Sequence, residues 1–221
     1  MATKGFGVEK PWLPEQYELV TEDTKVLLEG HDAEERIQGI LFRNLVVEEA
    51  DLSGLCLSRV KMERCTFIDC NFEKAELGNV LFQSCNFSGC HFNDSFLKQV
   101  EIRDSKGTGV RFCGSSIKEL LVINCNMGYA NFDGSRLEGV RFENVDLNNS
   151  DFGQCGCKRV SWEQVNLQNA SFFKTPLKGM DFTTSVIRGL VLSDECSELR
   201  GVTVDLYQAA ELAGRLGVII K

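Results

Sequence analysis

The fold is decided by the stretch CTFIDCNFEKAELGNVLFQSCNFSGCHF, residues 65–92. A large apolar residue recurs at every fifth position: Phe67, Phe72, Leu77, Phe82, Phe87 and Phe92. Two residues before each of them stands a smaller one: Cys65, Cys70, Ala75, Val80, Cys85 and Cys90. Neither an α-helix, with a period of 3.6, nor a simple strand, with a period of 2, produces this spacing.

The five-residue pattern extends far beyond this stretch. It runs from Ile37 to Leu192 through 32 central positions without an insertion, and only Gly107 and Cys157 are not large and apolar. Two inward residues in every five require a chain that turns a corner every five residues. Four such corners close a square coil of four quintets, and stacked coils pair their backbones about 4.8 Å apart.

A coil of four quintets predicts four faces, because central residues that lie four quintets apart should stack. One column contains six phenylalanines: Leu52, Phe72, Phe92, Phe112, Phe132, Phe152, Phe172 and Leu192. The column through Leu57 contains none. We name the faces A (column of Leu57), B (Phe42), C (Val47) and D (Phe72). A bare five-residue repeat would not sort phenylalanine in this way.

The ten cysteines raise the question of zinc ligands or disulfides. Six of them occupy the small inward position: Cys65, Cys70, Cys85, Cys90, Cys125 and Cys155. There a cysteine serves as a compact apolar residue, interchangeable with Ala, Ser or Val. Neighbouring inward positions belong to different faces, so we expect neither a metal site nor a disulfide set. Cys56, Cys113 and Cys196 lie off the inward positions.

Composition narrows the class of protein. The chain has 221 residues and a net charge of −8, and residues 1–35 hold nine acids against three bases. This acidity argues against direct binding of nucleic acid. The chain opens MATKGFGVEKPW without an apolar core, and no apolar run reaches the ~20 residues of a membrane helix. We therefore expect a cytoplasmic protein with reduced thiols and no membrane contact.

The quintets ADLSG, ANFDG, VDLNN, SDFGQ and ASFFK resemble the pentapeptide-repeat family. The resemblance covers residues 36 to about 195. It implies an all-β solenoid, a right-handed quadrilateral β-helix of about eight coils with a short C-terminal helix. We expect three segments: an N-terminal cap (1–35), the β-helix (36–195) and a C-terminal helix and tail (196–221).

The ends of the chain sharpen the resemblance. Residues 177–220, LKGMDFTTSVIRGLVLSDECSELRGVTVDLYQAAELAGRLGVII, look like the end of Qnr-type quinolone-resistance proteins. Residues 12–30, WLPEQYELVTEDTKVLLEG, are similar to the start of their Gram-positive forms. Such proteins, and mycobacterial MfpA, are dimers that bind DNA gyrase and topoisomerase IV by mimicking duplex DNA. The unbroken repeat implies the form that lacks projecting loops.

Surface charge is a weaker sign of DNA mimicry than the resemblance. The outward charges of face A sum to a positive value, whereas those of faces B, C and D sum to small negative values. If the rod imitates DNA, its acidic faces should meet the partner. The carboxylates predicted to do so are Asp69, Asp94, Asp133, Asp146, Asp151 and Asp194.

A solenoid needs caps, because its end coils expose apolar residues. Residues 1–35 are expected to supply the N-terminal cap, with a short turn of helix in PEQYEL after Pro14. After the last coil, Thr203 or Asp205 is a candidate N-cap for a helix over LYQAAELAGRLG, and Gly217 is a candidate for its end. This helix either lies on its own last coil or forms a two-fold dimer seam, the reading that we prefer. The residues predicted for the homodimer interface are Leu206, Ala209, Ala210, Leu212, Ala213, Leu216, Val218, Ile219 and Ile220.

Catalysis has little support. The two histidines, His31 and His91, are predicted to be solvated, and the glycines recur at turn positions. We therefore expect a protein that is not an enzyme and that has no cofactor and no metal. The first hypothesis is a Qnr-like dimer that binds type II topoisomerase and protects it from fluoroquinolones. The alternative is a general interaction module with another intracellular protein partner.

Overall fold

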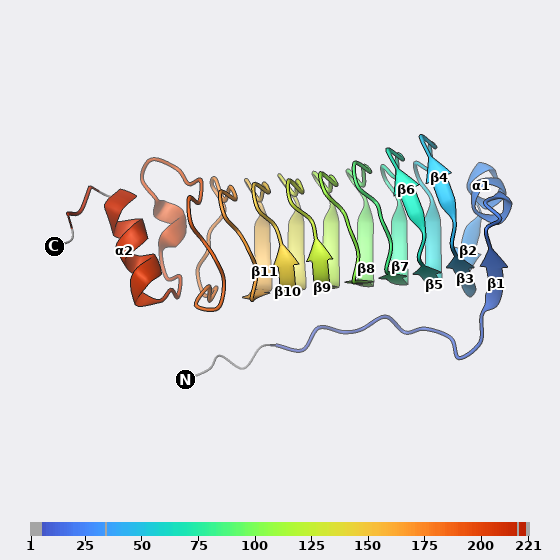
Figure 1. Ribbon diagram of the computed structural model, residues 1–221, viewed down its shortest axis with the longest axis horizontal. Coiled ribbons are helices and arrows are strands. Elements are labelled where there is room, and N and C mark those ends of the chain that lie inside the picture. The colour runs from blue at the N-terminus through green and yellow to red at the C-terminus, as the bar shows by residue number, and fades with distance from the viewer. Residues whose placement is uncertain (1–5, 34, 216, 220–221) are drawn as a thin grey trace.

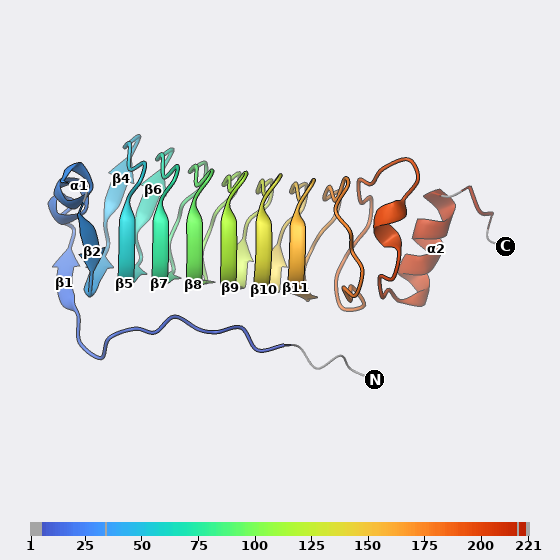
Figure 2. The same cartoon turned by 180° about the vertical axis from the view of Figure 1, so that it is seen from behind.

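The computed structural model describes residues 6–33, 35–215 and 217–219. They form a rod in which the chain winds from one end to the other, with a short helix at each end (Figure 1). Seen from behind, the strands of successive turns stand side by side along the rod (Figure 2). The predicted β-helix is confirmed.

One wall of the rod is a parallel sheet whose strands span faces A and B. In spatial order its strands are β1 (Glu18–Thr21), β3 (Ile40–Arg43), β5 (Cys56–Glu63), β7 (Glu76–Gln83), β8 (Phe96–Arg103), β9 (Ser116–Asn126), β10 (Arg136–Asp146) and β11 (Gly156–Glu163). The short β2 (Arg36–Gln38) also pairs with β5. On face C, β4 (Val46–Glu48) pairs with β6 (Thr66–Ile68).

The register confirms a turn of four quintets. Leu57 pairs with Leu77, Leu77 with Leu97, and Leu97 with Ile117. Every fifth residue from 39 to 189 has a positive φ, with Thr184 the exception. These residues form the corners, and the left-handed conformation there is the one that Gly, Asn and Asp tolerate best. The pattern accounts for the recurrence of those residue types at the end of each quintet.

The predicted columns fill the interior. On face D, Phe72, Phe92, Phe112, Phe132, Phe152 and Phe172 stack with ring centroids 4.6–5.2 Å apart. Face B points at them across the rod, and the Phe142 ring meets the Phe132 ring edge-on at 6.1 Å. The aromatic rings thus pack in the offset and edge-to-face arrangements that they prefer.

Gly107 interrupts the central column of face C, and the structure supplies the reason. A Cβ atom on Gly107 would lie 2.9 Å from Cδ2 of Phe87, the central residue one turn earlier. The ring of Phe87 is 3 % exposed. The Phe87 side chain therefore occupies the space that a larger residue at 107 would need.

The N-terminal end is closed by a helix at a different place from the one predicted. We expected a helical turn in PEQYEL, but the chain bends at Glu15 and Gln16 and then enters β1. Helix α1 (Lys25–Asp32) caps the coil instead, with Leu27 fully buried. His31, predicted to be solvated, contacts the carbonyl oxygen of Ser53 through Nε2 at 2.9 Å. That hydrogen bond joins the cap to face D.

The last turn departs from the regular register. In the regular turns the acceptor lies nineteen residues on, as where the N–H of Leu167 donates to the oxygen of Val186. The N–H of Leu177 donates to the oxygen of Glu198, two residues beyond that position, and the N–H of Gly179 donates to the oxygen of Gly201, three residues beyond it. About seven turns are therefore regular, where the length of the repeat predicts about eight. The 3₁₀ helix η1 (Ser197–Leu199) interrupts this irregular turn.

Glu198, in η1, holds the irregular turn together although its side chain is charged and the residue is only 4 % exposed. Its Oε1 accepts hydrogen bonds from the backbone N–H groups of Lys174 and Ser193, at 2.9 and 3.0 Å. Its Oε2 accepts one from the Ser193 hydroxyl. Burial favours the neutral acid, but these hydrogen bonds outweigh it and lower the pKa of Glu198.

Helix α2 (Leu206–Arg215) lies across the open end of the last coil. Asp205 is the N-cap: its Oδ1 accepts from the N–H of Gln208, whose Oε1 accepts from the N–H of Asp205. The Gln208 amide then donates to the carbonyl oxygens of Phe182 and Ser185, at 2.9 and 2.8 Å. A buried amide thus satisfies backbone acceptors that the coil would otherwise leave open. Among the described residues, no helix is long and apolar enough to cross a membrane.

Candidate protein-binding surface

The outer surface of faces C and D is built on hydrogen-bonded turns. Asn or Asp precedes many central residues, and its side-chain oxygen accepts a hydrogen bond from the N–H two residues on. In this way Asn131 binds the N–H of Asp133 at 2.8 Å, and Asp151 binds that of Gly153 at 2.8 Å. These Asx-turns explain why the repeat favours Asn and Asp at that position.

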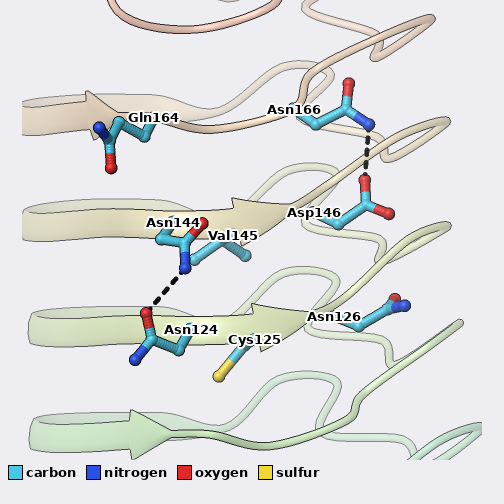
Figure 3. Close-up of a pocket in the computed structure, with 8 residues that line it drawn as sticks. All are labelled: Asn124, Cys125, Asn126, Asn144, Val145, Asp146, Gln164 and Asn166. Atoms are coloured by element: carbon cyan, nitrogen blue, oxygen red, sulfur yellow. Dashed lines mark hydrogen bonds between the residues drawn. The ribbon is translucent and has the colours of Figure 1, made fainter.

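A shallow, open hollow of about 450 Å³ lies where face B meets face C (Figure 3). It is lined by Asn124, Cys125, Asn126, Asn144, Val145, Asp146, Gln164 and Asn166. The amide of Asn144 donates to Oδ1 of Asn124 at 2.9 Å, one turn earlier. The amide of Asn166 donates to Oδ1 of Asp146 at 2.9 Å. Each side of the hollow is therefore a ladder of amides that repeats with the turns.

The residues that line this hollow offer donors and acceptors for hydrogen bonds but little support for catalysis. Asp146, the one carboxylate in its lining, also accepts hydrogen bonds from the backbone N–H and side-chain amide of Asn148. Its oxygens are committed to the turn and to the ladder. The arrangement suits binding of a polar surface, and no nucleophile stands beside a base in this lining.

The six predicted acidic residues fall into two groups. Asp69, Asp94 and Asp194 are exposed at corners of face C or face D. Asp133, Asp146 and Asp151 are half-buried. Besides the bonds above, Oδ1 of Asp133 accepts from the Gln154 amide at 3.4 Å. The sequence therefore places all six on the acidic faces, but Asp146 and Asp151 also serve the turns and Asp133 also contacts a neighbouring side chain.

Face A has the opposite character. Its outer surface carries exposed basic residues turn after turn: Lys98, Lys118, Arg136, Lys158 and Lys178. Glu138 offsets one of them, because its Oε1 is 2.6 Å from Nζ of Lys158, and this contact lowers the pKa of Glu138. The rod is thus basic on one face and mildly acidic on the faces C and D.

At the C-terminal end, the predicted interface residues divide between the two sides of α2. Leu212 is 8 % exposed and packs inward, where the buried Gln208 also lies. Ala210 and Ala213 are half-buried, whereas Ala209, Leu206, Val218 and Ile219 are exposed. Tyr207, which sequence reasoning missed, is 86 % exposed. Leu216 and Ile220 lie outside the residues whose side chains the structure describes.

The inward cysteines are buried, as their position in the repeat predicts. Their thiols also donate weak hydrogen bonds to backbone carbonyls of the preceding turn, as Cys125 does to Ile102. Burial raises the pKa of Cys125 to about 11. Cys65 and Cys85 lie on the same face in successive turns. The prediction from sequence rests on neighbouring quintets, which lie on different faces, and does not include this proximity. Among the described residues, no three His, Cys, Asp or Glu side chains gather as a metal site.

One further surface was missed by sequence reasoning. Residues 6–12 run outside the rod in both views (Figures 1 and 2), and their hydrogen bonds with Asn79, Gln99 and Glu119 place them along the edge between faces A and B. Phe6 and Trp12 contact arginines of that edge. The sequence shows that polar residues recur once per turn along this edge. That recurrence alone does not indicate that a segment from outside the repeat lies against the edge.

Comparisons with known proteins agree with the repeat. The family model described as "Pentapeptide repeat region" matches residues 75–152, and "Pentapeptide repeats (8 copies)" matches residues 48–83. A search of curated proteins finds no match.

The chain is also similar to several solved structures. Full-length QnrB1, a plasmid-mediated fluoroquinolone resistance protein, is 20 % identical with a TM-score of 0.45, over 80 % of this chain and 100 % of its own. A trypsin-treated point variant of QnrB1 is 27 % identical with a TM-score of 0.44, over 85 % and 91 %. HetL from the cyanobacterium Nostoc is 14 % identical with a TM-score of 0.41, over 81 % and 92 %.

Proposed function

Because the chain belongs to the pentapeptide-repeat family, we propose that its rod acts by binding a protein partner, and that this partner is a type II topoisomerase. In this proposal faces C and D meet the DNA-binding surface of DNA gyrase or topoisomerase IV. The protein then protects the enzyme from fluoroquinolones in the cytoplasm without binding nucleic acid itself. The resemblance of residues 12–30 and 177–220 to Qnr-type proteins supports the choice of partner.

The observation that carries the proposal is the segregation of charge around the rod. Exposed carboxylates of Asp69, Asp94 and Asp194 stand on faces C and D, whose outward charges sum to a negative value although exposed bases such as Lys74 and Lys174 also lie there, and exposed lysines stand on face A. A basic surface that normally holds DNA would attract the first side and repel the second. Asp94 and Asp194 lie on one edge five turns apart, roughly 24 Å at strand spacing.

The rod is much less charged than the DNA that it would replace. Duplex DNA carries one negative charge per about 1.7 Å of its axis. Shape and a few ion pairs must therefore provide the affinity, with charge steering the encounter. Each exposed ion pair contributes only about 0–1 kcal/mol, so single substitutions of these acids should have small effects.

A dimer is part of the same proposal. Leu206, Tyr207, Val218 and Ile219 are large apolar residues that stand exposed at the C-terminal end of the rod. Two copies related by a two-fold axis would bury these residues against one another and double the length of the rod. Leu206→Glu together with Tyr207→Glu should yield a monomer by sedimentation, because both side chains point away from the coil. Trp12→Glu, at another exposed apolar site, should leave the dimer intact.

Gyrase supercoiling with and without ciprofloxacin tests the partner. The wild-type protein should bind gyrase and preserve supercoiling in the presence of the drug. A variant with Asp69→Lys, Asp94→Lys and Asp194→Lys should lose both effects, because attraction becomes repulsion. In a second variant, Asp133, Asp146 and Asp151 become Asn, which removes charge but keeps a side-chain oxygen for the turns.

The matched control changes the same amount of charge elsewhere. Glu15→Lys, Glu18→Lys and Glu76→Lys alter exposed acids outside faces C and D, and this variant should bind as the wild type does. Binding by the wild type should also weaken as salt rises. If the first triple variant stays folded and still binds gyrase at low salt, faces C and D are not the interface.

A second candidate function is an interaction module for a different protein. The nearly balanced charge of the repeat favours it, since residues 36–195 hold 20 acids and 18 bases. Failure of wild-type protein to bind either topoisomerase would leave this candidate as the better account of the rod.

A further inference from the structure

The edge between faces A and B holds a peptide that belongs to the chain itself. This edge, which we call the A/B edge, consists of the corner residues Arg59, Asn79, Gln99, Glu119, Gly139 and Arg159. Residues 6–12, FGVEKPW, which we call the N-terminal arm, run along it from the level of β11 to that of β5 (Figures 1 and 2). The arm runs opposite to the direction in which the coils advance.

Two kinds of contact hold the arm. Arginines of the A/B edge lie over its aromatic rings: Arg159 over Phe6 and Arg59 over Trp12, each with 5.6 Å between Cζ and the ring centroid. Edge side chains also accept hydrogen bonds from its backbone. The N–H of Trp12 donates to Oδ1 of Asn79 at 2.7 Å. Together, the cation–π contacts and the backbone hydrogen bonds recognise an extended chain that carries aromatic side chains.

The middle of the arm is held by a network of hydrogen bonds and one ion pair. The N–H of Glu9 donates to Oε2 of Glu119 at 2.9 Å, and the Gln99 amide donates to Oε2 of Glu9 at 3.1 Å. The other oxygen of Glu119, Oε1, is 2.7 Å from a guanidinium nitrogen of Arg159, two turns further on. One carboxylate thus links the arm to the arginine that contacts Phe6.

Gly139 makes this link possible. It stands on the A/B edge between Glu119 and Arg159, and a Cβ atom on it would lie 2.7 Å from Cδ of Glu119. Its φ of 68° belongs to the left-handed region common to the corners. The glycine therefore leaves room for the Glu119 carboxylate to pass across one turn and reach Arg159.

The spacings of peptide and rod are commensurate. Three extended residues advance about 10 Å, and two turns of the rod advance about the same distance. Phe6, Glu9 and Trp12 follow one another at three-residue intervals and meet edge residues at intervals of about two turns. An extended peptide with anchors at every third residue therefore stays in register with the A/B edge.

From these contacts we propose that the A/B edge is a binding site for extended peptides of the pattern aromatic-x-x-Glu-x-x-aromatic. The N-terminal arm occupies the site in cis, and a peptide of this chemistry on another chain displaces it. Trp12 is 63 % exposed even in the bound arm, so the occupant is held by its contacts and not by enclosure. The site lies away from the exposed carboxylates of faces C and D.

Binding of a labelled peptide, FGVEKPWL (residues 6–13), to the full chain tests the proposal by fluorescence anisotropy. In the wild type, the tethered arm competes at an effective concentration in the millimolar range. A full-chain variant with Phe6→Ala and Trp12→Ala disables this competitor, and we expect it to bind the peptide at least roughly tenfold more tightly. Adding Arg59→Ala and Arg159→Ala to that variant should reduce binding by roughly tenfold or more.

Two controls make the result specific. Arg111→Ala and Arg136→Ala, at other sites on the rod, should leave peptide binding to the arm-disabled variant unchanged. A peptide of the same composition with its aromatic residues three apart should bind no better than a random peptide. Equal binding by the edge variant and its control, or no saturation up to about 1 mM peptide, would overturn the proposal.

Hydrogen exchange on the wild-type chain gives an independent readout that needs no arm substitutions. The amides of Glu9 and Trp12 should exchange more slowly than neighbouring arm amides, because each donates to an edge side chain. Excess unlabelled peptide should speed up their exchange without changing that of β5 to β11. Unchanged exchange at saturating peptide would show that the arm is not displaced, and would refute exchangeable binding at this edge.

Discussion

Phe132→Ala should strongly destabilise the rod. The Phe132 ring is fully buried and stacks between Phe112 and Phe152, with centroid distances of 5.1 and 4.8 Å. Removing it leaves a cavity in the middle of a continuous column, where neighbours on both sides are fixed by their own turns. Deletion of a buried phenylalanine side chain costs about 3–5 kcal/mol. For a chain of this size, the melting temperature falls by about 2–4 °C for each kcal/mol.

The matched control deletes the same atoms from the outside of the rod. Phe96 lies on the outer surface of β8 and is 41 % exposed. Phe96→Ala should cost no more than about 1.5 kcal/mol, because part of the ring is already in water. Thermal and urea unfolding followed by circular dichroism would compare the variants. Equal losses for Phe132→Ala and Phe96→Ala would refute the idea that the face D column carries the stability of the rod.

Three further predictions concern single positions. Gly107→Ala should cost about 1–3 kcal/mol in urea unfolding because its Cβ would strike the Phe87 ring, and Phe87→Leu should recover part of that loss. Glu198→Gln should destabilise by about 1–3 kcal/mol at pH 7. The folded-state pKa of Glu198 is lowered, so its carboxylate stabilises the fold above the unfolded-state pKa of 4.5. The loss of stability in Glu198→Gln, relative to the wild type, should therefore shrink as the pH falls below 4.5. A loss that stays constant in thermal melts from pH 7 to 3 would contradict this. Cys65→Ala and Cys85→Ala should leave a folded protein, and elemental analysis of the wild type should find no stoichiometric zinc; one zinc per chain would overturn that expectation.

The interior of the rod could be predicted from the sequence because each inward position obeys a simple spacing. A shift of one residue would turn every central side chain toward solvent, so apolar residues record the register directly. The same reasoning placed Asp69 and Asp94 outside. It could not show that the carboxylates of Asp146 and Asp151 accept hydrogen bonds from backbone N–H groups. The sequence does not distinguish an aspartate that is bound in a turn from one that is exposed to solvent.

The ends were predicted less well because they depend on contacts outside the repeat. Gln208 is polar and stands in a helix, yet it is buried because two carbonyl oxygens of the last coil need donors. The place of α1 follows from burial of Leu27 on the first coil, and not from the prolines before it. The N-terminal arm is fixed by side chains from turns that are far apart in the chain. Such pairings appear only when the coils are assembled.

The unbroken turn of four quintets has a consequence for how such a rod changes in evolution. Loss or gain of one quintet would rotate everything downstream by a quarter turn, so that the stacked rings of face D would continue on a neighbouring face. Loss or gain of four quintets together keeps every column continuous and alters only length. The N-terminal arm adds a second condition, because one turn corresponds to about one and a half extended residues. Rod and arm therefore stay matched when two turns and three arm residues are inherited or lost together.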